Sequence, residues 1–200
     1  MTTKIGIYDV DSKIPNLALM KISQWHKSKG SEVELYNPLW LDTYDKIFAS
    51  KVFDFSDGSM LIPGRMTIGG TGWDISSALP LELESVSPDY TLYGYEHSIG
   101  FTMRGCRFNC KFCVVPKKEG KPKPYNTVNE IWTNRDSVFI VLLDNDFFGN
   151  PEWAERIKEI KDYGLKVNFS QGLNIRTITD EQAKALTSVR FSTISGKSKR

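Results

Sequence analysis

The three cysteines of the chain lie close together in the segment RGCRFNCKFC, at positions 106, 110 and 113. Their spacing is C-x3-C-x2-C, and Phe112 directly precedes the last of them. Three clustered thiolates can hold an iron–sulfur cluster while leaving one iron without a protein ligand. An open metal position is a place where chemistry can occur. The spacing therefore predicts a metal-binding loop formed by Cys106, Cys110 and Cys113.

Two other interpretations of the cysteines stay open at this point. Structural zinc usually takes four ligands, often from two C-x2-C pairs, and the sequence contains one such pair. His97 is separated from Cys106 by eight residues, and His26 belongs to the other half of the chain. Ordinary packed thiols are the second alternative, but a loop rich in Arg, Lys and Asn is a poor match to core packing.

The composition places limits on the kind of protein. With 200 residues, of which 40% are hydrophobic, the chain can build one large domain or two small ones. The net charge of +2 does not by itself favour a nucleic-acid or membrane partner. There is no apolar run near the roughly 20 residues of a spanning helix, and no secretory signal is visible. The odd, clustered cysteines argue against a disulfide framework, so we expect a cytoplasmic location and no membrane partner.

Alternating strand and helix patterns divide the chain into two α/β halves. In the first half, Pro15 is expected to open a helix that ends at Gly30. Strands are predicted at 4–9, 32–36, 45–52 and 65–68. Between Pro80 and Glu96 the pattern gives way to a proline- and tyrosine-containing connector. We therefore predict an N-terminal domain at 1–95 and a second domain at 96–200.

The second half repeats the alternation of strand and helix. Capping-box pairs, Thr127 with Glu130 and Thr179 with Gln182, indicate where two of its helices begin. The tail SGKSKR is expected to fray. The predicted strands are 98–103, 138–143, 165–169 and 189–194, and the predicted helices are 127–133, 151–163 and 179–185.

The segment GCRFNCKFC resembles the C-x3-C-x-aromatic-C signature of the radical S-adenosylmethionine (radical SAM) superfamily. The resemblance implies a [4Fe-4S] cluster on Cys106, Cys110 and Cys113, whose unique iron binds the amino and carboxylate groups of S-adenosylmethionine. One-electron reduction would cleave the sulfonium and give a 5′-deoxyadenosyl radical that abstracts hydrogen from a substrate. Phe112 would shield the cluster. A one-electron reductant such as flavodoxin or ferredoxin would be a partner.

Two further stretches resemble the same superfamily. At the end of the second strand, where relatives place polar groups near the methionine end of the cofactor, the candidates are Asp144 and Asn145. The stretch ending the third strand resembles the Q-G-L-D/N-x-R sequence of proteins related to methylthiotransferases. This resemblance implies that Gln171, Asn174 and Arg176 face cofactor or substrate. The alternative for both stretches is a polar turn that ends a strand or caps a helix.

Basic residues surround the cysteines, offset within the same stretch by Glu119. They can compensate the charge of an anionic cluster, or they can contact the phosphates of an RNA substrate. The segment lacks a clear array of aromatic residues for base stacking, so local compensation is favoured over RNA. The residues are Arg104, Arg107, Lys111, Lys117, Lys118, Lys121 and Lys123.

The first half resembles the cobalamin-binding, flavodoxin-like module that precedes some radical SAM domains. Members that bind cobalamin carry D-x-H-x-x-G after the first strand, with histidine as the lower cobalt ligand. Here Asp9 is followed by Asp11, without a histidine or a matching glycine. The flavodoxin-like fold is therefore expected, whereas cobalamin ligation by histidine is not. Gly69–Gly72 is predicted to form a tight turn.

The second half is shorter than the catalytic domain that the resemblance implies. Residues 98–200 accommodate three βα units and one strand, at roughly 30 residues per unit, whereas relatives form a six-stranded partial barrel. We therefore expect an incomplete radical SAM barrel, from a truncated or split gene product or a fragment completed by a second chain. The alternatives to a radical SAM enzyme are a non-catalytic iron–sulfur-binding fragment and a zinc-stabilised binding domain.

Overall fold

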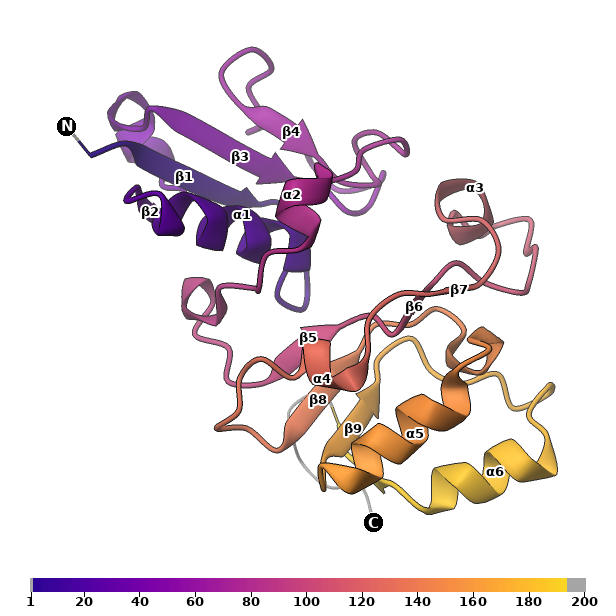
Figure 1. Cartoon of the computed structure of the whole chain (residues 1–200). Coiled ribbons are helices and arrows are strands. Elements are labelled where there is room, and N and C mark those ends of the chain that lie inside the picture. Colours follow the sequence, from indigo (N-terminus) through magenta and orange to yellow (C-terminus); the bar gives the residue numbers. More distant parts are fainter. Residues whose placement is uncertain (1, 194–200) are drawn as a thin grey trace. The chain divides into compact units, whose positions relative to one another are not determined.

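The computed structural model describes residues 2–193 of the chain. By its internal contacts the chain divides into two compact units, Met1–Tyr95 and Glu96–Arg200 (Figure 1). Each unit contains a four-stranded sheet in which every pairing is parallel. The predicted α/β class with parallel sheets is thus confirmed. Ile194, the expected end of the last strand, and the tail expected to fray lie outside the described residues.

In the first unit the strands are ordered β2-β1-β3-β4. Asn16 caps the long helix, because its side chain accepts a hydrogen bond from the amide of Leu19. Pro15 was predicted to lie in the first turn of this helix, but it lies just before the N-cap residue. The elements are β1 (Lys4–Asp9), α1 (Leu17–Ser28), β2 (Glu32–Leu35), η1 (Pro38–Thr43), β3 (Lys46–Ser50), β4 (Thr67–Gly69), α2 (Leu81–Glu84) and η2 (Tyr90–Leu92).

The two faces of the first sheet are covered differently. Helix α1 packs against β1 and β3, and its His26 ring contacts Phe48 at a centroid distance of 5.1 Å (Figure 1). On the opposite face, the ring of Tyr44 lies under Gly6, where an added Cβ would meet it at 3.2 Å. Leu61 and Met66, from the long connection between β3 and β4, pack there with Tyr44. Loop side chains therefore cover this face of the sheet, whereas helix α1 covers the other face.

In the second unit the strands are ordered β10-β9-β8-β5, and a separate antiparallel ribbon joins β6 to β7. Both predicted capping boxes are present, at Thr127–Glu130 and Thr179–Gln182. The elements are β5 (Ser98–Gly100), β6 (Met103–Arg104), α3 (Val115–Lys118), β7 (Lys123–Pro124), α4 (Val128–Ile131), β8 (Phe139–Leu142), η3 (Phe147–Gly149), α5 (Trp153–Asp162), β9 (Lys166–Phe169), α6 (Asp180–Thr187) and β10 (Arg190–Phe191).

The core of the second unit lies between its sheet and helices. Ile157 and Ile160 of α5 pack with Ile140, Leu142 and Val167 of the central strands, and all five are nearly inaccessible to solvent. Helix α5 contacts both α4 and α6, so the three helices lie side by side along the sheet (Figure 1). The continuous apolar run of β8 is buried at every position, as expected for a central parallel strand.

The structure corrects one predicted strand. Residues 98–103 were expected to form a single strand, but β5 ends at Gly100 and β6 begins at Met103. The break occurs because the amides of Thr102 and Met103 donate to the carboxylate of Asp144 and not to a neighbouring strand. This break turns the chain out of the sheet immediately before the cysteines.

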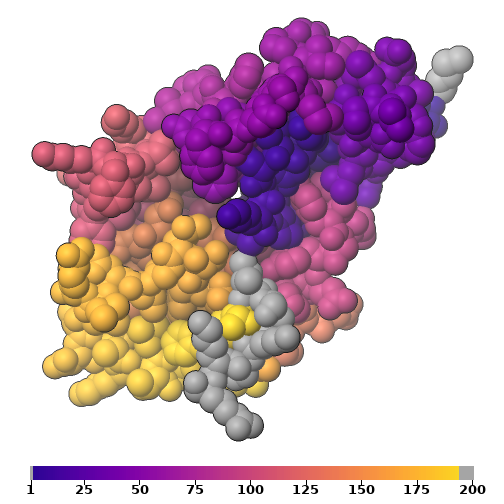
Figure 2. Space-filling model, turned by 180° about the vertical axis from the view of Figure 1, so that it is seen from behind, coloured from indigo at the N-terminus to yellow at the C-terminus, as the bar shows by residue number. Residues whose placement is uncertain are grey.

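The surface of the first unit includes several large apolar side chains from the loops that follow β3 and β4. Phe53 and Phe55 stack on each other with ring centroids 5.3 Å apart, and Phe55 is mostly exposed. This loop region contributes to the purple surface in Figure 2. No helix among the described residues is both long enough and apolar enough to cross a membrane.

Candidate functional site

The cysteine loop leaves the carboxyl end of β5, at the edge of the sheet where β8 and β9 also end. Backbone pairing continues past the strands, because the amide of Leu143 donates to the carbonyl of Gly100 at 2.8 Å. The amide of Ser170 likewise donates to the carbonyl of Leu142 at 2.9 Å. The parallel sheet thereby brings three stretches to one edge: the cysteine loop, residues 143–146 and residues 170–176. In parallel α/β sheets this edge is where ligands bind.

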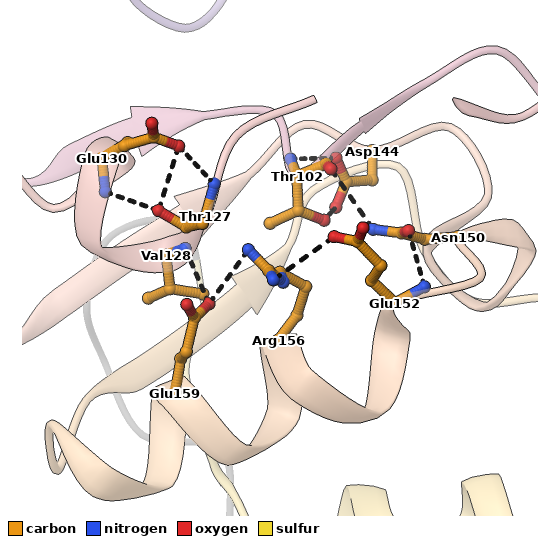
Figure 3. A network of polar contacts seen from close by, with 9 residues as sticks. All are labelled: Thr102, Thr127, Val128, Glu130, Asp144, Asn150, Glu152, Arg156 and Glu159. Atoms are coloured by element: carbon orange, nitrogen blue, oxygen red, sulfur yellow. Dashed lines mark hydrogen bonds and ion pairs between the residues drawn. The ribbon is translucent and has the colours of Figure 1, made fainter. Parts of the chain in front are cut away.

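Asp144 is buried and faces the base of the loop (Figure 3). Its Oδ1 accepts hydrogen bonds from the amides of Thr102 and Met103, at 2.7 and 3.0 Å. Its Oδ2 accepts a bond from the Thr102 hydroxyl at 2.6 Å. Burial raises the pKa of Asp144 to about 6, although these hydrogen bonds act in the opposite direction. Its carboxylate therefore anchors the chain just before the cysteines.

The same anchor extends into the helical layer. Asn150 donates from Nδ2 to the carbonyl of Thr102 at 3.2 Å and accepts from the amide of Glu152 at 3.0 Å (Figure 3). In helix α5, the guanidinium of Arg156 lies between the carboxylates of Glu152 and Glu159, at 3.3 Å from each. Polar contacts thus connect the root of the cysteine loop to the start of α5.

Asn145 contributes to the loop through Glu119. Its Nδ2 lies 3.5 Å from Oε2 of Glu119, and that oxygen accepts the amide of Gly105 at 2.9 Å. The other oxygen of Glu119 forms an ion pair with Arg104 at 2.6 Å. Gly105 has φ of +87°, and an added Cβ would lie 2.3 Å from the carbonyl oxygen of Lys121. Only glycine fits where the two sides of the loop approach so closely.

Asp146 holds the residue that follows the first cysteine. Its Oδ2 accepts from the amide and Nε of Arg107, at 3.0 and 2.8 Å, and its Oδ1 accepts from an Nη at 2.9 Å. The pair is a two-pronged guanidinium–carboxylate contact, which fixes orientation as well as distance. Asp146 is buried, whereas Arg107 is partly exposed.

The three cysteines have unequal surroundings. Cys106 and Cys113 are partly buried, and Cys110 is exposed. The Sγ of Cys106 accepts the amide of Phe108 at 3.4 Å, and the amide of Cys113 donates to the carbonyl of Cys110 at 3.0 Å. Burial raises the pKa of the Cys106 thiol, and the charges of Asp146, Cys113 and Cys110 add to that effect. The thiols of Cys110 and Cys113 are therefore near enough to Cys106 to affect its pKa.

The donor set fits a thiolate-bound metal group in its chemistry. Within residues 2–193, no three His, Cys, Asp or Glu side chains are already gathered closely enough to hold a metal ion. The three thiols nevertheless lie on one short loop, and thiolates are the ligands that iron–sulfur clusters take. The loop would have to close around such a group.

The remaining candidates near the loop are open to solvent. Phe112 is 93% exposed, so it packs against little of the described chain. Gln171 and Arg176 are exposed at the end of β9. Asn174 forms a local turn, accepting the amide of Arg176 at 3.1 Å. These three polar residues lie at the predicted sheet edge, but in this structure their described contacts are local.

Two alternatives from the sequence can now be weighed against the structure. His97 contacts Ser137 at 3.0 Å and packs edge-on against Phe139, just before β5 begins, whereas the cysteines follow the other end of that strand. It is therefore not placed as a fourth zinc ligand. Of the basic residues, Arg104 and Arg107 are paired with carboxylates. The lysines 111, 117, 121 and 123 are exposed.

The carboxyl edge of the first sheet is closed by its own polar groups. Asp9 accepts from the hydroxyl of Tyr93 at 2.7 Å, and Asp11 accepts from the amides of Val52 and Phe53, both at 2.8 Å. Gly70 has φ of +97°, and a Cβ there would lie 2.2 Å from the carbonyl oxygen of Lys51. The glycine stretch is packed against backbone, which agrees with the predicted tight turn.

Comparison with known proteins does not add a family to these observations. Neither a scan against protein-family models nor a search of curated proteins gave a match. The functional argument accordingly depends on the residues themselves.

Sequence reasoning did not single out Thr102 or Asp146, and it named Arg107 and Glu119 only as charged residues around the cysteines, without their anchoring contacts. One signal was available, because Asp144 and Asp146 alternate directly after a buried strand, a pattern that places acidic groups at the sheet edge. Their partners lie about forty residues earlier, and nothing local in the sequence joins them.

Proposed function

We propose that this chain is a radical SAM protein that binds a [4Fe-4S] cluster through Cys106, Cys110 and Cys113. The observation that carries the proposal is the position of a C-x3-C-x2-C loop at the carboxyl end of the first strand of a parallel βα sheet. The bound cluster would supply one electron for reductive cleavage of S-adenosylmethionine. The second unit would then be part of a radical SAM barrel, and the first a flavodoxin-like module.

The chain's own residues would perform three tasks in this function. Asp144, Glu119 and Asp146 hold the stretch from Thr102 to Arg107. The exposed Gln171 and Arg176 are available to contact a cofactor or substrate beside the loop. Exposed Phe112 can cover the cluster once the loop has closed. A cytoplasmic one-electron donor such as flavodoxin or ferredoxin would serve as the partner, and the substrate would be a molecule with an abstractable hydrogen.

A second candidate function is cluster binding without catalysis. The observation favouring it is the short edge strand β10, Arg190–Phe191, which leaves the described sheet with four strands. Further strands, beyond those described, would be needed to complete the barrel and its cofactor pocket. Cobalamin is not part of either candidate, because Asp9 and Asp11 are engaged within the first unit and the chain has no histidine between them and α1.

Anaerobic iron–sulfur reconstitution tests the proposal. The reduced protein should give the electron paramagnetic resonance signal of a [4Fe-4S] cluster, and S-adenosylmethionine should change that signal. The single variants Cys106→Ser, Cys110→Ser and Cys113→Ser should each lose the signal. A signal that ignores the cofactor would favour the non-catalytic candidate. Colourless protein that retains stoichiometric zinc and no iron would overturn both.

A further inference from the structure

Acceptors from outside the segment 102–107 bind its backbone amides at closely spaced points. Asp144 accepts the amides of Thr102 and Met103, and Glu119 accepts the amide of Gly105. The amide of Cys106 donates to the carbonyl of Gly120 at 3.2 Å. Cys106 is therefore held through its own amide, and the residues before and after it are held as well.

Among residues 2–193, no such anchors are seen for the rest of the loop. From residue 109 to residue 114, the described hydrogen bonds are local, such as that between the amide of Cys113 and the carbonyl of Cys110. Cys110 is exposed. The difference between the two parts of one loop requires an explanation, because all three cysteines would bind the same group.

The ion pair between Arg107 and Asp146 anchors a residue next to a cysteine in the sequence. Arg107 directly follows Cys106, and both its backbone and its guanidinium donate to the same carboxylate. Gly149 leaves room for the pair, since a Cβ there would lie 2.3 Å from Oδ2 of Asp146 and 3.2 Å from Cγ of Arg107. The local backbone is thus shaped around this contact.

Charge explains why the anchor is a pair. A buried carboxylate beside thiolates would repel them, and Asp146 does act electrostatically on Cys106. The guanidinium of Arg107 offsets this charge while using the carboxylate as a fixed acceptor. A lysine at this position would keep the positive charge but lose the two-pronged geometry.

We propose that Arg107 and Asp146 are a positioning pair that fixes Cys106 before the metal group binds, so that Cys110 and Cys113 close onto a ligand already in place. This inference rests on the proposed function for the identity of the metal group. Neither residue is proposed to touch the cofactor or substrate. Their effect is transmitted through the backbone of the first cysteine.

Hydrogen–deuterium exchange of the metal-free protein tests the first part. Asp146→Asn and Arg107→Lys should each speed exchange in the peptide covering 102–107 by about tenfold, the loss expected for a charge-assisted hydrogen bond. Asp136→Asn is the matched control, because it makes the same change at an exposed carboxylate of the same unit. Its exchange in this peptide should equal that of the unmodified chain.

The second part is tested by the iron bound after anaerobic reconstitution. Both positioning variants should bind several-fold less iron than the control at equal, limiting iron, with thermal unfolding still cooperative. Faster exchange with normal iron content would make the pair merely structural and overturn the proposal, as would unchanged exchange in both variants. If Asp146→Asn does not fold, the proposal is judged on Arg107→Lys alone, because this variant retains both charges of the pair. Failure of the unmodified chain to bind iron would refute the proposed function, while the exchange data would still decide whether the pair holds the loop.

Discussion

The two sheets of this protein treat their carboxyl edges in opposite ways. In the first unit, Asp11 accepts the amide of Val52 just after β3, and Asp9 accepts the hydroxyl of Tyr93 after η2. Gly70 packs against the backbone of Lys51. In the second unit, Asp144 and Asp146 bind the root of a loop whose thiols remain available. The same parallel architecture carries an internally bonded edge in one unit and a cysteine-bearing loop in the other.

This contrast teaches how a site can be recognised without a bound ligand. Acidic residues follow the strands of both sheets, so the presence of carboxylates alone does not distinguish the edges. What differs is what the carboxylates hold: in the first unit two backbone amides and a tyrosine hydroxyl, and in the second a segment that carries a cysteine. The partners of the polar residues, more than their types, indicate function.

The largest effect is expected from disrupting the packed glycine turn at the carboxyl edge of the first sheet. Gly70→Ala should destabilise the first unit by roughly 2–5 kcal/mol, the sum of about 1–2 for the left-handed backbone and about 1–3 for overpacking. Gly30→Ala is the control, because Gly30 also has positive φ, +81°, but nothing within 4 Å of an added Cβ. It should cost about 1–2 kcal/mol in chemical denaturation. Equal losses for the two variants would show that the glycine turn is not tightly packed.

A smaller effect should appear in the second unit as a pH dependence. The pKa of Asp144 is raised from 3.8 to about 6, so the folded state retains a proton that the unfolded state loses. Stability should therefore fall as pH rises from about 4 to about 7, by at most about 3 kcal/mol. In Asp144→Asn the amide oxygen can accept both backbone bonds while its NH₂ donates to the Thr102 hydroxyl.

The measurement for Asp144 is the free energy of unfolding of both proteins across this pH range. The difference should grow in favour of Asp144→Asn as pH rises, because only the original residue must ionise while buried. Parallel pH curves for the two proteins would mean that the carboxyl is not titrating in this way.

The smallest change is expected at the open part of the loop. Phe112→Ala should alter the stability of the metal-free protein by less than about 0.5 kcal/mol, because the ring is 93% exposed. Phe147→Ala, at a 1% exposed core position, should cost about 3–5 kcal/mol by the same denaturation assay. After reconstitution, the iron–sulfur cluster of Phe112→Ala should have a shorter lifetime in air than that of the unmodified protein. An unchanged lifetime would remove the shielding role.

Local signals in the sequence predicted much of the framework. The buried run of β8 and the capping boxes at Thr127 and Thr179 are encoded within a few residues, and the structure contains them where expected. The helix predicted from Pro151 begins at Trp153, since terminal residues of a helix are set by contacts beyond the local pattern.

The anchoring of the site could not be predicted in the same way. Asp144 was expected beside the cofactor, but its oxygens accept bonds from Thr102 and Met103, about forty residues earlier in the chain. Which group a strand-end carboxylate meets depends on how β5 and β8 pair, and that register is a property of the folded sheet. The cysteine cluster could be found from the sequence alone. The contacts that hold the chain around Cys106 could not be.

The separation between Arg107 and Asp146 also has a consequence for how the protein is made. These residues are 39 positions apart, so at about 5–20 residues per second the ribosome needs about 2–8 s to supply the second after the first. During that interval the cysteines already synthesised belong to a nascent segment that lacks its contacts with Asp144 and Asp146. Metal delivered then would meet thiols on an unsupported chain, and delivery after β8 has paired would meet a first cysteine already held.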